Sequence, residues 1–457
     1  MYPKNQTFLV FGLSRSGVSA TEFLLSQNAQ VYIHDDLSSP RIEKTTEELV
    51  KKGAKRVSVE ELSSMPERCD ALVLSPGIAV DHPLAVAFKR AKKGVVGESE
   101  IACRYMRCPI IAVTGTNGKT TTVSMLTKSL KEGGINAFAC GNIGAPMIDF
   151  SCEDNGVAVA EISSFQMETL SSIRPHIAVF LNITEDHLNR HYNMENYIFL
   201  KAKLLKNMTE TEFAVFNYDD ETVKVFAEKA KARVVWFSVK ERVNGAYLED
   251  GFLTFNGEKI LSSKELSLGG IHNIQNALAV IASCKILGVE NSVIKKALVE
   301  FKGIKHRLER IAEIDGVEYI DDSKGTNIDA TLQAIKTVKR DTVLLLGGKN
   351  KGYEYKKLFT EIKNSKVRQA VLYGENRYAL LKGAREESFE NITLCQDFYT
   401  AVSIARLLVK SGETVLLSPA SASFDEFAGY EERGDKFVEI VRGFKGETDA
   451  QADEIEE

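Results

Sequence analysis

A glycine-rich turn between an apolar run and an amphipathic segment has the residue types that bind a triphosphate. The run 110–113 predicts a buried strand, and the segment that begins at Lys119 predicts a helix. Glycines let backbone N–H groups approach phosphates, and a helix N-terminus adds a partial positive charge. Lys119 can neutralise phosphate charge, and the Thr120 hydroxyl is a Mg²⁺ ligand type. The turn therefore predicts an ATP site made by Gly115, Thr116, Asn117, Gly118, Lys119, Thr120 and Thr121.

The turn departs from the common phosphate loop G-x-x-x-x-G-K-[ST] at one position. The first glycine of that pattern falls on Val113, so the loop here is the shorter Gly-Thr-Asn-Gly-Lys-Thr. This difference predicts a nucleotide-binding subclass of its own.

Charged residues follow the next predicted strands. Glu161 ends the strand 157–162, a position that suits a Mg²⁺-directed carboxylate, although many strand-terminal carboxylates are only solvated. The strand 177–181 leads into an acidic and histidine cluster at 182–187, which is too polar for a core and suits a metal or a phosphate. Lys201 shares a helical face with apolar neighbours, and the commoner state of such a lysine is extension to solvent.

Two amide-bearing segments are open to two interpretations each. Asn142 lies in a short Gly-Asn-Ile-Gly loop, which is either a ligand contact or a plain turn. Asn273 and Asn276 are three residues apart at the start of a helix, where they can meet a purine edge or cap the helix.

Another glycine loop opens the chain's first helix. The loop 12–17 follows a strand, and Asp35 ends the next strand, which favours a diphosphate and its ribose at this edge. Ser14 occupies the middle glycine position of G-x-G-x-x-G, so a dinucleotide is disfavoured. The segment 75–78, with Gly77, ends another strand at the same edge.

Strand and helix segments alternate along most of the chain and predict parallel α/β sheets in three domains. The predicted boundaries are 1–96 for a Rossmann-like domain, 97–303 for a central ATP-binding domain and 304–445 for a second Rossmann-like domain. The segment 446–457 carries six acidic side chains and predicts a disordered tail.

Bulk properties exclude several classes. The chain has 457 residues and a net charge of −5, which disfavours a nucleic-acid partner. No apolar stretch reaches membrane-spanning length, and no signal peptide is visible. The seven scattered cysteines contain no C-x-x-C pair, which predicts reduced thiols in a cytoplasmic protein.

Taken in order, these motifs resemble the Mur ligase family, the ATP-dependent amino-acid ligases of peptidoglycan synthesis. The resemblance covers nearly the whole chain and rests on 115–120, Glu-Ile-Ser-Ser-Phe-Gln at 161–166, Leu-Asn-Ile-Thr-Glu-Asp-His at 181–187, Tyr197 with Lys201, His-Asn-Ile-Gln-Asn at 272–276 and His-Arg at 306–307.

Within the family, Asp-Ser-Lys-Gly-Thr-Asn at 322–327 and the segments 75–78 and 417–425 resemble the members that add D-glutamate to UDP-N-acetylmuramoyl-L-alanine. Two departures are Lys349, where some members have Asp, and the Ser14-Arg15 pair in the first loop.

The resemblance implies an acyl-phosphate mechanism with ATP, two Mg²⁺ ions and a carbamate formed from CO₂ on Lys201, in a monomer. The implied catalytic residues are Lys119, Glu161, His187, Lys201 and Arg307, and the implied metal ligands are Thr120, Glu161, His187 and carbamylated Lys201. The implied ATP contacts outside the loop are Asn273, Asn276, Arg307, Asp322 and Lys324. The implied UDP-substrate contacts are Ser16, Asp35, Gly77, Asn142 and Arg190, and those to D-glutamate are Thr326, Lys351, Ser423, Phe424 and Tyr430.

Three alternatives remain. Another amino-acid-adding Mur ligase shares most of these motifs, and a folylpolyglutamate-synthase-like ligase shares the later domains. A regulatory module that binds ATP and a UDP-sugar without catalysis would not need Glu161, His187 and Lys201 together.

Overall fold

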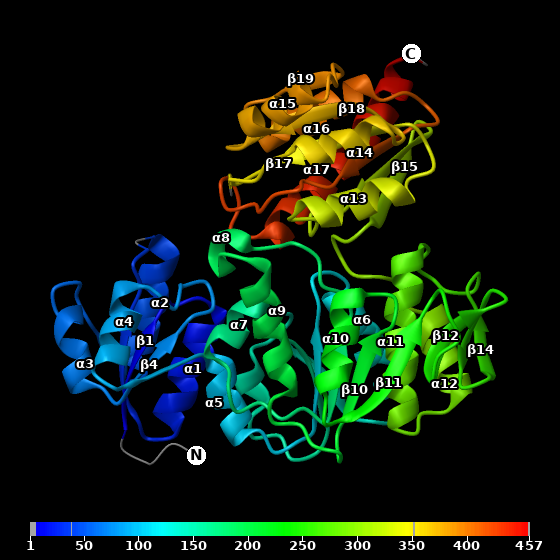
Figure 1. The fold of residues 1–457 in the computed structure, drawn as a ribbon. Helices are drawn as coiled ribbons and strands as arrows, with labels where there is room; N and C mark the ends of the chain where they lie inside the picture. The colour runs from blue at the N-terminus through cyan, green and yellow to red at the C-terminus, as the bar shows by residue number, and fades with distance from the viewer. Residues whose placement is uncertain (1–5, 38, 351, 456–457) are drawn as a thin grey trace. The chain divides into compact units, whose positions relative to one another are not determined.

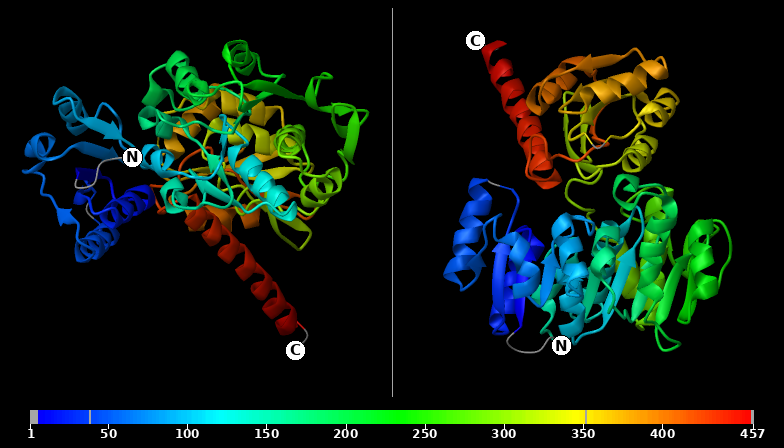
Figure 2. Two further views of the ribbon diagram at one scale, coloured as in Figure 1. Left: turned by 90° about the horizontal axis from the view of Figure 1, so that it is seen from below. Right: turned by 60° about the vertical axis from the view of Figure 1, so that its left-hand side comes forward.

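The structure, a computed structural model, describes residues 6–37, 39–350 and 352–455. The chain forms two compact units, Met1–Phe301 and Lys302–Glu457. The first unit holds two β-sheets and the second holds one, each covered by helices (Figures 1 and 2). This three-domain α/β architecture confirms the predicted fold class, while the predicted domain boundaries remain predictions.

The N-terminal sheet is fully parallel, with strand order β3-β2-β1-β4-β5. Phe8 and Val10 pack on one face of β1, while Leu9 and Phe11 pack on the other, so both faces are covered. The loops after β1 and β4 lie side by side at the carboxyl ends of the strands, where ligands bind in such sheets. The elements are β1 (Thr7–Phe11), α1 (Arg15–Ser26), β2 (Gln30–His34), α2 (Pro40–Lys51), β3 (Lys55–Arg56), α3 (Met65–Arg68), β4 (Ala71–Leu74), α4 (Pro83–Arg90) and β5 (Gly94–Val96).

The central sheet has nine strands in the order β14-β13-β12-β11-β10-β9-β6-β8-β7. The strands from β7 to β12 are parallel, and β13 and β14 extend the sheet in antiparallel pairing. The strands β12 and β13 form a hairpin whose turn residues Asp250 and Gly251 both have positive φ, at 51° and 78°.

The central elements are α5 (Glu98–Tyr105), β6 (Ile110–Thr114), α6 (Lys119–Glu132), β7 (Ala137–Gly141), β8 (Val157–Glu161), α7 (Ser164–Thr169), β9 (Ile177–Phe180), α8 (Leu188–His191), α9 (Met194–Ala202), β10 (Phe213–Asn217), α10 (Glu221–Lys229), β11 (Arg233–Ser238), β12 (Gly245–Glu249), β13 (Phe252–Phe255), β14 (Glu258–Ser262), α11 (Ile271–Ile286) and α12 (Asn291–Val299). Short 3₁₀ turns lie at Leu62–Ser64, Met147–Phe150 and Lys203–Leu205.

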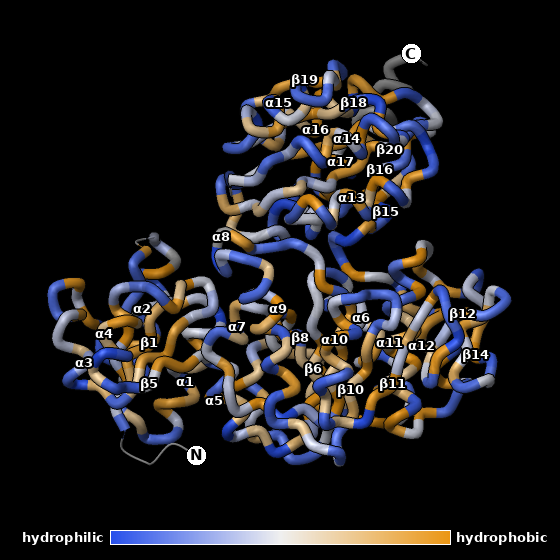
Figure 3. The backbone as a smooth tube through the Cα atoms, in the orientation of Figure 1, coloured by the Kyte–Doolittle hydropathy of each residue, from blue (hydrophilic) through white to orange (hydrophobic). Residues whose placement is uncertain are grey.

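The second unit has a six-stranded sheet in the order β15-β16-β20-β17-β18-β19, parallel except for β15. Alternate residues of β17 enter two separate cores, and the strands form the hydrophobic interior in Figure 3. The elements are β15 (Glu309–Ile314), β16 (Val317–Asp321), α13 (Ile328–Thr337), β17 (Thr342–Gly347), α14 (Lys356–Lys363), β18 (Val367–Tyr373), α15 (Arg377–Glu386), β19 (Ile392–Leu394), α16 (Phe398–Leu408), β20 (Thr414–Leu417) and α17 (Tyr430–Ile455).

Helix α17 continues to Ile455, into the segment for which the acidic composition predicts disorder. All seven cysteines are free thiols. Over the described residues, no helix combines the length and apolar character needed to cross a membrane.

Candidate functional site

The phosphate loop lies at the carboxyl end of β6, between the loops that follow β8 and β9. Asn182, after β9, fastens it from both sides. Its Oδ1 accepts a hydrogen bond from the Asn117 amide at 2.8 Å, and its Nδ2 donates to the Asn117 carbonyl at 3.0 Å. The Thr116 amide also donates to the Asn182 carbonyl at 2.8 Å. These contacts with Asn182 hold the shape of the loop.

Gly118 is required where the loop turns into α6. Its φ is +87°, and a Cβ at this position would lie 2.3 Å from Oδ1 of Asn276. The close approach brings the start of α11 against the loop. Asn273 and Asn276 are both buried, and Asn273 Nδ2 donates to the Gly269 carbonyl at 2.8 Å. Both predicted adenine-site amides thus lie next to the phosphate loop.

A carboxylate and two side chains that face it form a group suited to Mg²⁺. Thr120 Oγ1 donates to Oε2 of Glu161 at 2.8 Å, and Asn142 Nδ2 donates to Oε1 of Glu161 at 2.8 Å. Glu161 is 3% exposed, at the end of β8. Carboxylate and hydroxyl oxygens are the ligands that Mg²⁺ prefers, so this donor set fits a magnesium ion.

Two lysines converge on one backbone carbonyl. Lys119 Nζ and Lys201 Nζ donate to the Gly115 oxygen at 2.8 and 2.9 Å. Lys201 does not extend to solvent, because it is 1% exposed and its ammonium lies over the Tyr197 ring, 4.6 Å from the centroid. Burial and the Lys119 charge hold the pKa of Lys201 well below its usual value. Lys201 therefore loses its proton more readily than an exposed lysine.

His187 lies in the loop after β9, directly before α8. It has the left-handed φ of 56°, and its Nε2 lies 3.4 Å from Oδ2 of Asp186. Its ring also contacts the Phe165 ring, with centroids 4.6 Å apart. Since Thr116 Oγ1 donates to the Thr184 carbonyl at 3.1 Å, the segment with His187 is tied to the phosphate loop.

The N-terminal sheet has its own polar edge. Asp35 Oδ2 accepts from the Leu13 amide at 2.6 Å, and Ser75 Oγ donates to the Gly12 carbonyl at 2.9 Å. Ser16 is half-buried in the first turn of α1, and Gly77 is exposed. A cavity of about 360 Å³ opens beside Leu13 and Asp35. Ser16, Asp35 and Gly77, three of the five predicted UDP contacts, therefore lie at this edge of the sheet.

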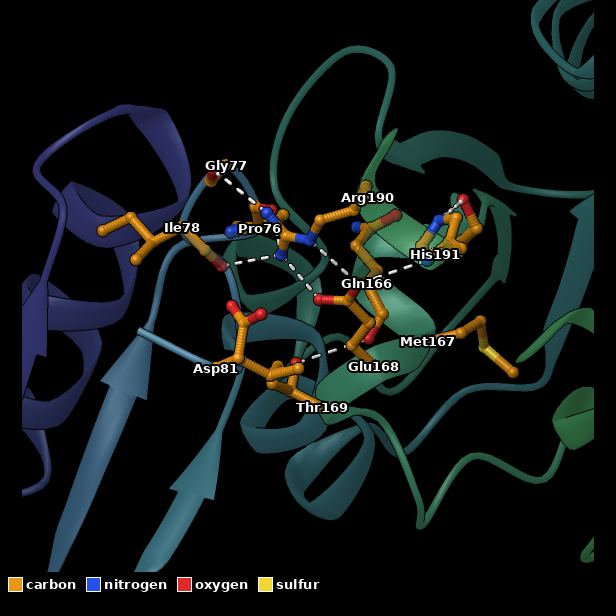
Figure 4. A network of polar contacts seen from close by, with 12 residues as sticks. Pro76, Gly77, Ile78, Asp81, Gln166, Met167, Glu168, Thr169, Arg190 and His191 are labelled. Carbon is orange, nitrogen blue, oxygen red and sulfur yellow. Dashed lines mark hydrogen bonds and ion pairs between the residues drawn. The ribbon is translucent and has the colours of Figure 1, made fainter. Parts of the chain in front are cut away.

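Arg190 has an arrangement that the sequence did not indicate. Its guanidinium pairs with Glu168 and donates to backbone carbonyls of the segment 76–78 (Figure 4).

In the second unit, Asp322 lies in the loop after β16. Its Oδ2 accepts from Ser418 Oγ at 2.7 Å and its Oδ1 from the Leu308 amide at 3.3 Å. Burial raises the pKa of Asp322 to about 7, although the nearby Arg307 guanidinium favours the ionised form. The predicted pair of Arg307 and Asp322 is thus brought together.

The residues predicted for D-glutamate are distributed over the loops of this same unit. Lys324 Nζ donates to the Tyr430 hydroxyl at 2.8 Å, and Thr326 is half-buried. Ser423 is buried and Phe424 is 68% exposed. Lys351 lies outside the described residues.

Arg433 is a residue whose role the sequence did not reveal. It is fully buried, and its guanidinium donates to Ser323 Oγ at 3.0 Å and to the carbonyls of Ser323, Ser421 and Gly347 at 2.9, 3.0 and 3.4 Å. It thereby fastens the loops after β16, β17 and β20 to α17. These partners are distant along the sequence, so no local pattern could identify them.

Three family models match the chain in sequence. They describe a Mur ligase MurD-like N-terminal domain over residues 6–97, a Mur ligase middle domain over 113–284 and a Mur ligase glutamate ligase domain over 306–421.

Curated relatives match over nearly their full length. The UDP-N-acetylmuramoylalanine–D-glutamate ligase of Pelotomaculum thermopropionicum is 41% identical, with 96% of this chain and 97% of the relative covered. The enzyme of the same name from Clostridioides difficile is 37% identical, with 97% and 99% covered.

Among solved structures, the UDP-N-acetylmuramate-alanine ligase MurC of Thermotoga maritima has a TM-score of 0.64 at 19% identity and covers 96% of this chain and 100% of its own. A pseudomurein peptide ligase type C of Methanothermus fervidus has a TM-score of 0.60 at 19% identity and covers 96% and 100%. At this identity the structures support the fold alone.

Proposed function

The chain belongs to the Mur ligase family, and we propose that it joins D-glutamate to UDP-N-acetylmuramoyl-L-alanine, with conversion of ATP to ADP and phosphate. The observation that carries the chemistry is the convergence of Lys119, Lys201 and the Thr120–Glu161 pair on one phosphate loop. The choice of substrate is supported by relatives at 36–41% identity that carry the D-glutamate ligase name over nearly the whole chain.

The reaction has two balanced steps. An oxygen of the L-alanine carboxylate attacks the γ-phosphorus of ATP and ADP leaves, which gives an acyl phosphate. The amine of D-glutamate then attacks the acyl carbon, loses a proton and expels phosphate from a tetrahedral intermediate. Both steps bring anions together, so the site must supply positive charge and alignment.

The first unit supplies the groups at the transferring phosphate. Lys119 holds the β- and γ-phosphates, and the loop amides of 115–118 neutralise them further. Thr120 and Glu161 would hold a Mg²⁺ ion, which when bound polarises the γ-phosphate. Asn142, through its contact with Glu161, orients that carboxylate and faces the substrate.

Lys201 has a separate role in this proposal. As a neutral buried amine it attacks CO₂, a proton is lost to solvent, and the resulting carbamate is an anion with two oxygen ligands. Together with His187 it would hold a second Mg²⁺ ion. The low pKa of Lys201 supports this role, because only the neutral amine is a nucleophile.

The second unit supplies further contacts. Arg307, Asp322 and Lys324 receive the nucleotide, together with Asn273 and Asn276 of the first unit. Its D-glutamate contacts are Thr326, Lys351, Ser423, Phe424 and Tyr430. On the N-terminal sheet, Ser16, Asp35 and Gly77 receive the UDP group. We further propose that the enzyme acts as a cytoplasmic monomer without a nucleic-acid partner, and the net charge of −5 supports the last of these three points.

Phosphate release tests the proposal. The purified enzyme with ATP, Mg²⁺ and UDP-N-acetylmuramoyl-L-alanine is assayed in parallel with D-glutamate, L-glutamate and L-lysine. We expect release only with D-glutamate, together with a product heavier by one glutamate residue. Release with L-lysine, or none with D-glutamate, would overturn the assignment of substrate. A further reaction replaces the UDP substrate by a folate acceptor, and release there with L-glutamate would favour the folylpolyglutamate-type alternative.

A further inference from the structure

Arg190 of α8 connects two sets of loops within the first unit. Its Nη2 donates to the carbonyl oxygens of Ile78 at 2.7 Å and Pro76 at 3.4 Å, and its Nη1 donates to that of Gly77 at 3.3 Å. These carbonyls belong to the loop after β4 of the N-terminal sheet, whereas α8 follows β9 of the central sheet (Figure 4). One side chain thus holds the N-terminal loop to the central domain.

The guanidinium is itself fixed in place by Glu168 of α7. Nε donates to Oε1 at 2.9 Å and Nη2 to Oε2 at 2.6 Å, which is the planar two-point geometry that only arginine provides. The two side chains are 14% and 7% exposed. Burial opposes ionisation of Glu168, but hydrogen bonds from His191 and Arg190 outweigh it and hold its pKa below the usual value. Glu168 is therefore the anionic anchor of Arg190.

Contacts extend from Arg190 in both directions. On the central side, the guanidinium lies 5.1 Å from the centroid of the Phe165 ring, which also packs against the His187 ring. On the N-terminal side, the held loop includes Ser75, whose Oγ donates to the Gly12 carbonyl in the first glycine loop. The predicted metal ligand and the predicted diphosphate loop are thus joined through Arg190.

The family resemblance implies a direct contact of Arg190 with the UDP substrate. We propose instead that Arg190 is a positioning residue, which sets the span between the UDP-binding loops and the phosphate loop through its contacts with the loop 76–78. This inference rests on the proposed function. One substrate molecule must place its uridine end on the N-terminal sheet and its carboxylate at the ATP γ-phosphate. Binding energy from the remote end aids the reaction only if this span is fixed.

The test compares two dissociation constants in each variant, one for UDP and one for UDP-N-acetylmuramoyl-L-alanine, both in the presence of ADP and Mg²⁺. The ratio of the dissociation constant for UDP to that for UDP-N-acetylmuramoyl-L-alanine measures how much the far end of the substrate adds to binding. A general loss of folded protein leaves this ratio unchanged. Arg190→Lys keeps the charge but cannot contact Glu168 at two points and the carbonyls together. We expect the ratio to fall by about tenfold, with kcat reduced and the KM for ATP unchanged.

A matched control exists in the same unit. Arg174 pairs with Glu212 through the same two nitrogens, Nε at 3.0 Å and Nη2 at 2.7 Å, although both contact the single oxygen Oε1. Arg174→Lys should leave the ratio at the wild-type value. Glu168→Gln provides a second route, because it weakens the anchor while Arg190 keeps its side chain, and it should lower the ratio less than Arg190→Lys.

An unchanged ratio in both Arg190→Lys and Glu168→Gln would overturn the positioning role, and so would an equal fall in Arg174→Lys. A wild-type enzyme that binds UDP but gains nothing from the muramoyl-L-alanine portion would instead overturn the proposed function, and the role of Arg190 with it. The wild-type measurement alone therefore separates the two failures.

Discussion

Lys201 in the first unit and Arg433 in the second are both almost sealed from solvent, at 1% and 0% exposure, but their partners differ. Arg433 donates four hydrogen bonds to a hydroxyl and three carbonyls that come from three loops. Lys201 donates a single hydrogen bond, to the Gly115 carbonyl, and its ammonium lies near the Lys119 charge.

The difference indicates two uses of a buried cation. A guanidinium whose donors are satisfied stays charged and holds loops together, because its hydrogen bonds replace those to water. An ammonium with few partners is poorly solvated, so it loses its proton easily and becomes reactive. On this comparison, Lys201 serves the chemistry and Arg433 serves the fold of the second unit.

Replacement of Lys201 by Ala is expected to have the largest effect. Without the amine, the proposed carbamate cannot form, and turnover should fall by at least about a hundredfold. Phosphate release measures the rate, and ADP binding by calorimetry should remain near the wild-type value. Lys206→Ala, at an exposed lysine five residues further along, is the control and should keep full activity. Unchanged turnover in Lys201→Ala would remove Lys201 from the site.

Replacement of Arg433 by Met tests the structural side of the comparison. The change leaves three carbonyls and a hydroxyl without their donor, so the free energy of unfolding of the second unit should fall by about 3–5 kcal/mol. Urea unfolding followed by circular dichroism, with hydrogen exchange in β16 and β20, measures the loss. Arg385→Met, at an exposed position on α15, should change stability by less than about 0.5 kcal/mol. Equal stability of Arg433→Met and wild type would contradict the clamp.

Replacement of Lys201 by Met should change the free energy of unfolding in the opposite direction to Arg433→Met. Removing a poorly paired buried amine should raise the free energy of unfolding of the first unit by about 1–2 kcal/mol at pH 7 in CO₂-free buffer. The only tryptophan, Trp236, lies in this unit and reports its unfolding by fluorescence.

The stability difference between Lys201→Met and the wild type should depend on pH, because the pKa of Lys201 is lowered in the folded protein. Between the folded pKa and the usual value of 10.5, the unfolded chain binds the extra proton, so wild-type stability rises with pH in this window. The advantage of Lys201→Met should therefore shrink as the pH approaches 10.5. An advantage that stays constant from pH 7 to 10 would show that Lys201 is charged in the folded protein.

Much of the fold could be predicted from the sequence because it depends on local patterns. The apolar run 110–113 became the central strand β6, and the predicted glycine loop lies at its carboxyl end. The acidic segment after Gly446 differs, since helix α17 continues through it to Ile455. The acidic composition of this segment indicates a preference for solvent. It does not indicate the helix, which begins further up the chain, where Phe437 and Val441 pack in the core of the second unit.

The site could be predicted only in part. Thr120 and Glu161 are 41 residues apart, and topology could place them together because Glu161 ends β8 and Thr120 opens the helix that follows the neighbouring strand β6. The burial of Lys201 could not be derived from its own helix, where extension to solvent is the commoner state, and the family resemblance implied its carbamate but not its burial. The roles of Arg190 and Arg433 depend on distant carbonyls, which leave no mark on side-chain patterns.

The fate of one oxygen atom tests the central claim most directly. UDP-N-acetylmuramoyl-L-alanine labelled with ¹⁸O at both oxygens of its L-alanine carboxylate is turned over with ATP and D-glutamate, and the released phosphate is analysed by mass spectrometry. An acyl phosphate requires that each phosphate leave with one oxygen of the carboxylate, so the account predicts one ¹⁸O in each phosphate formed. Phosphate without label would contradict activation of the carboxylate at this phosphate loop.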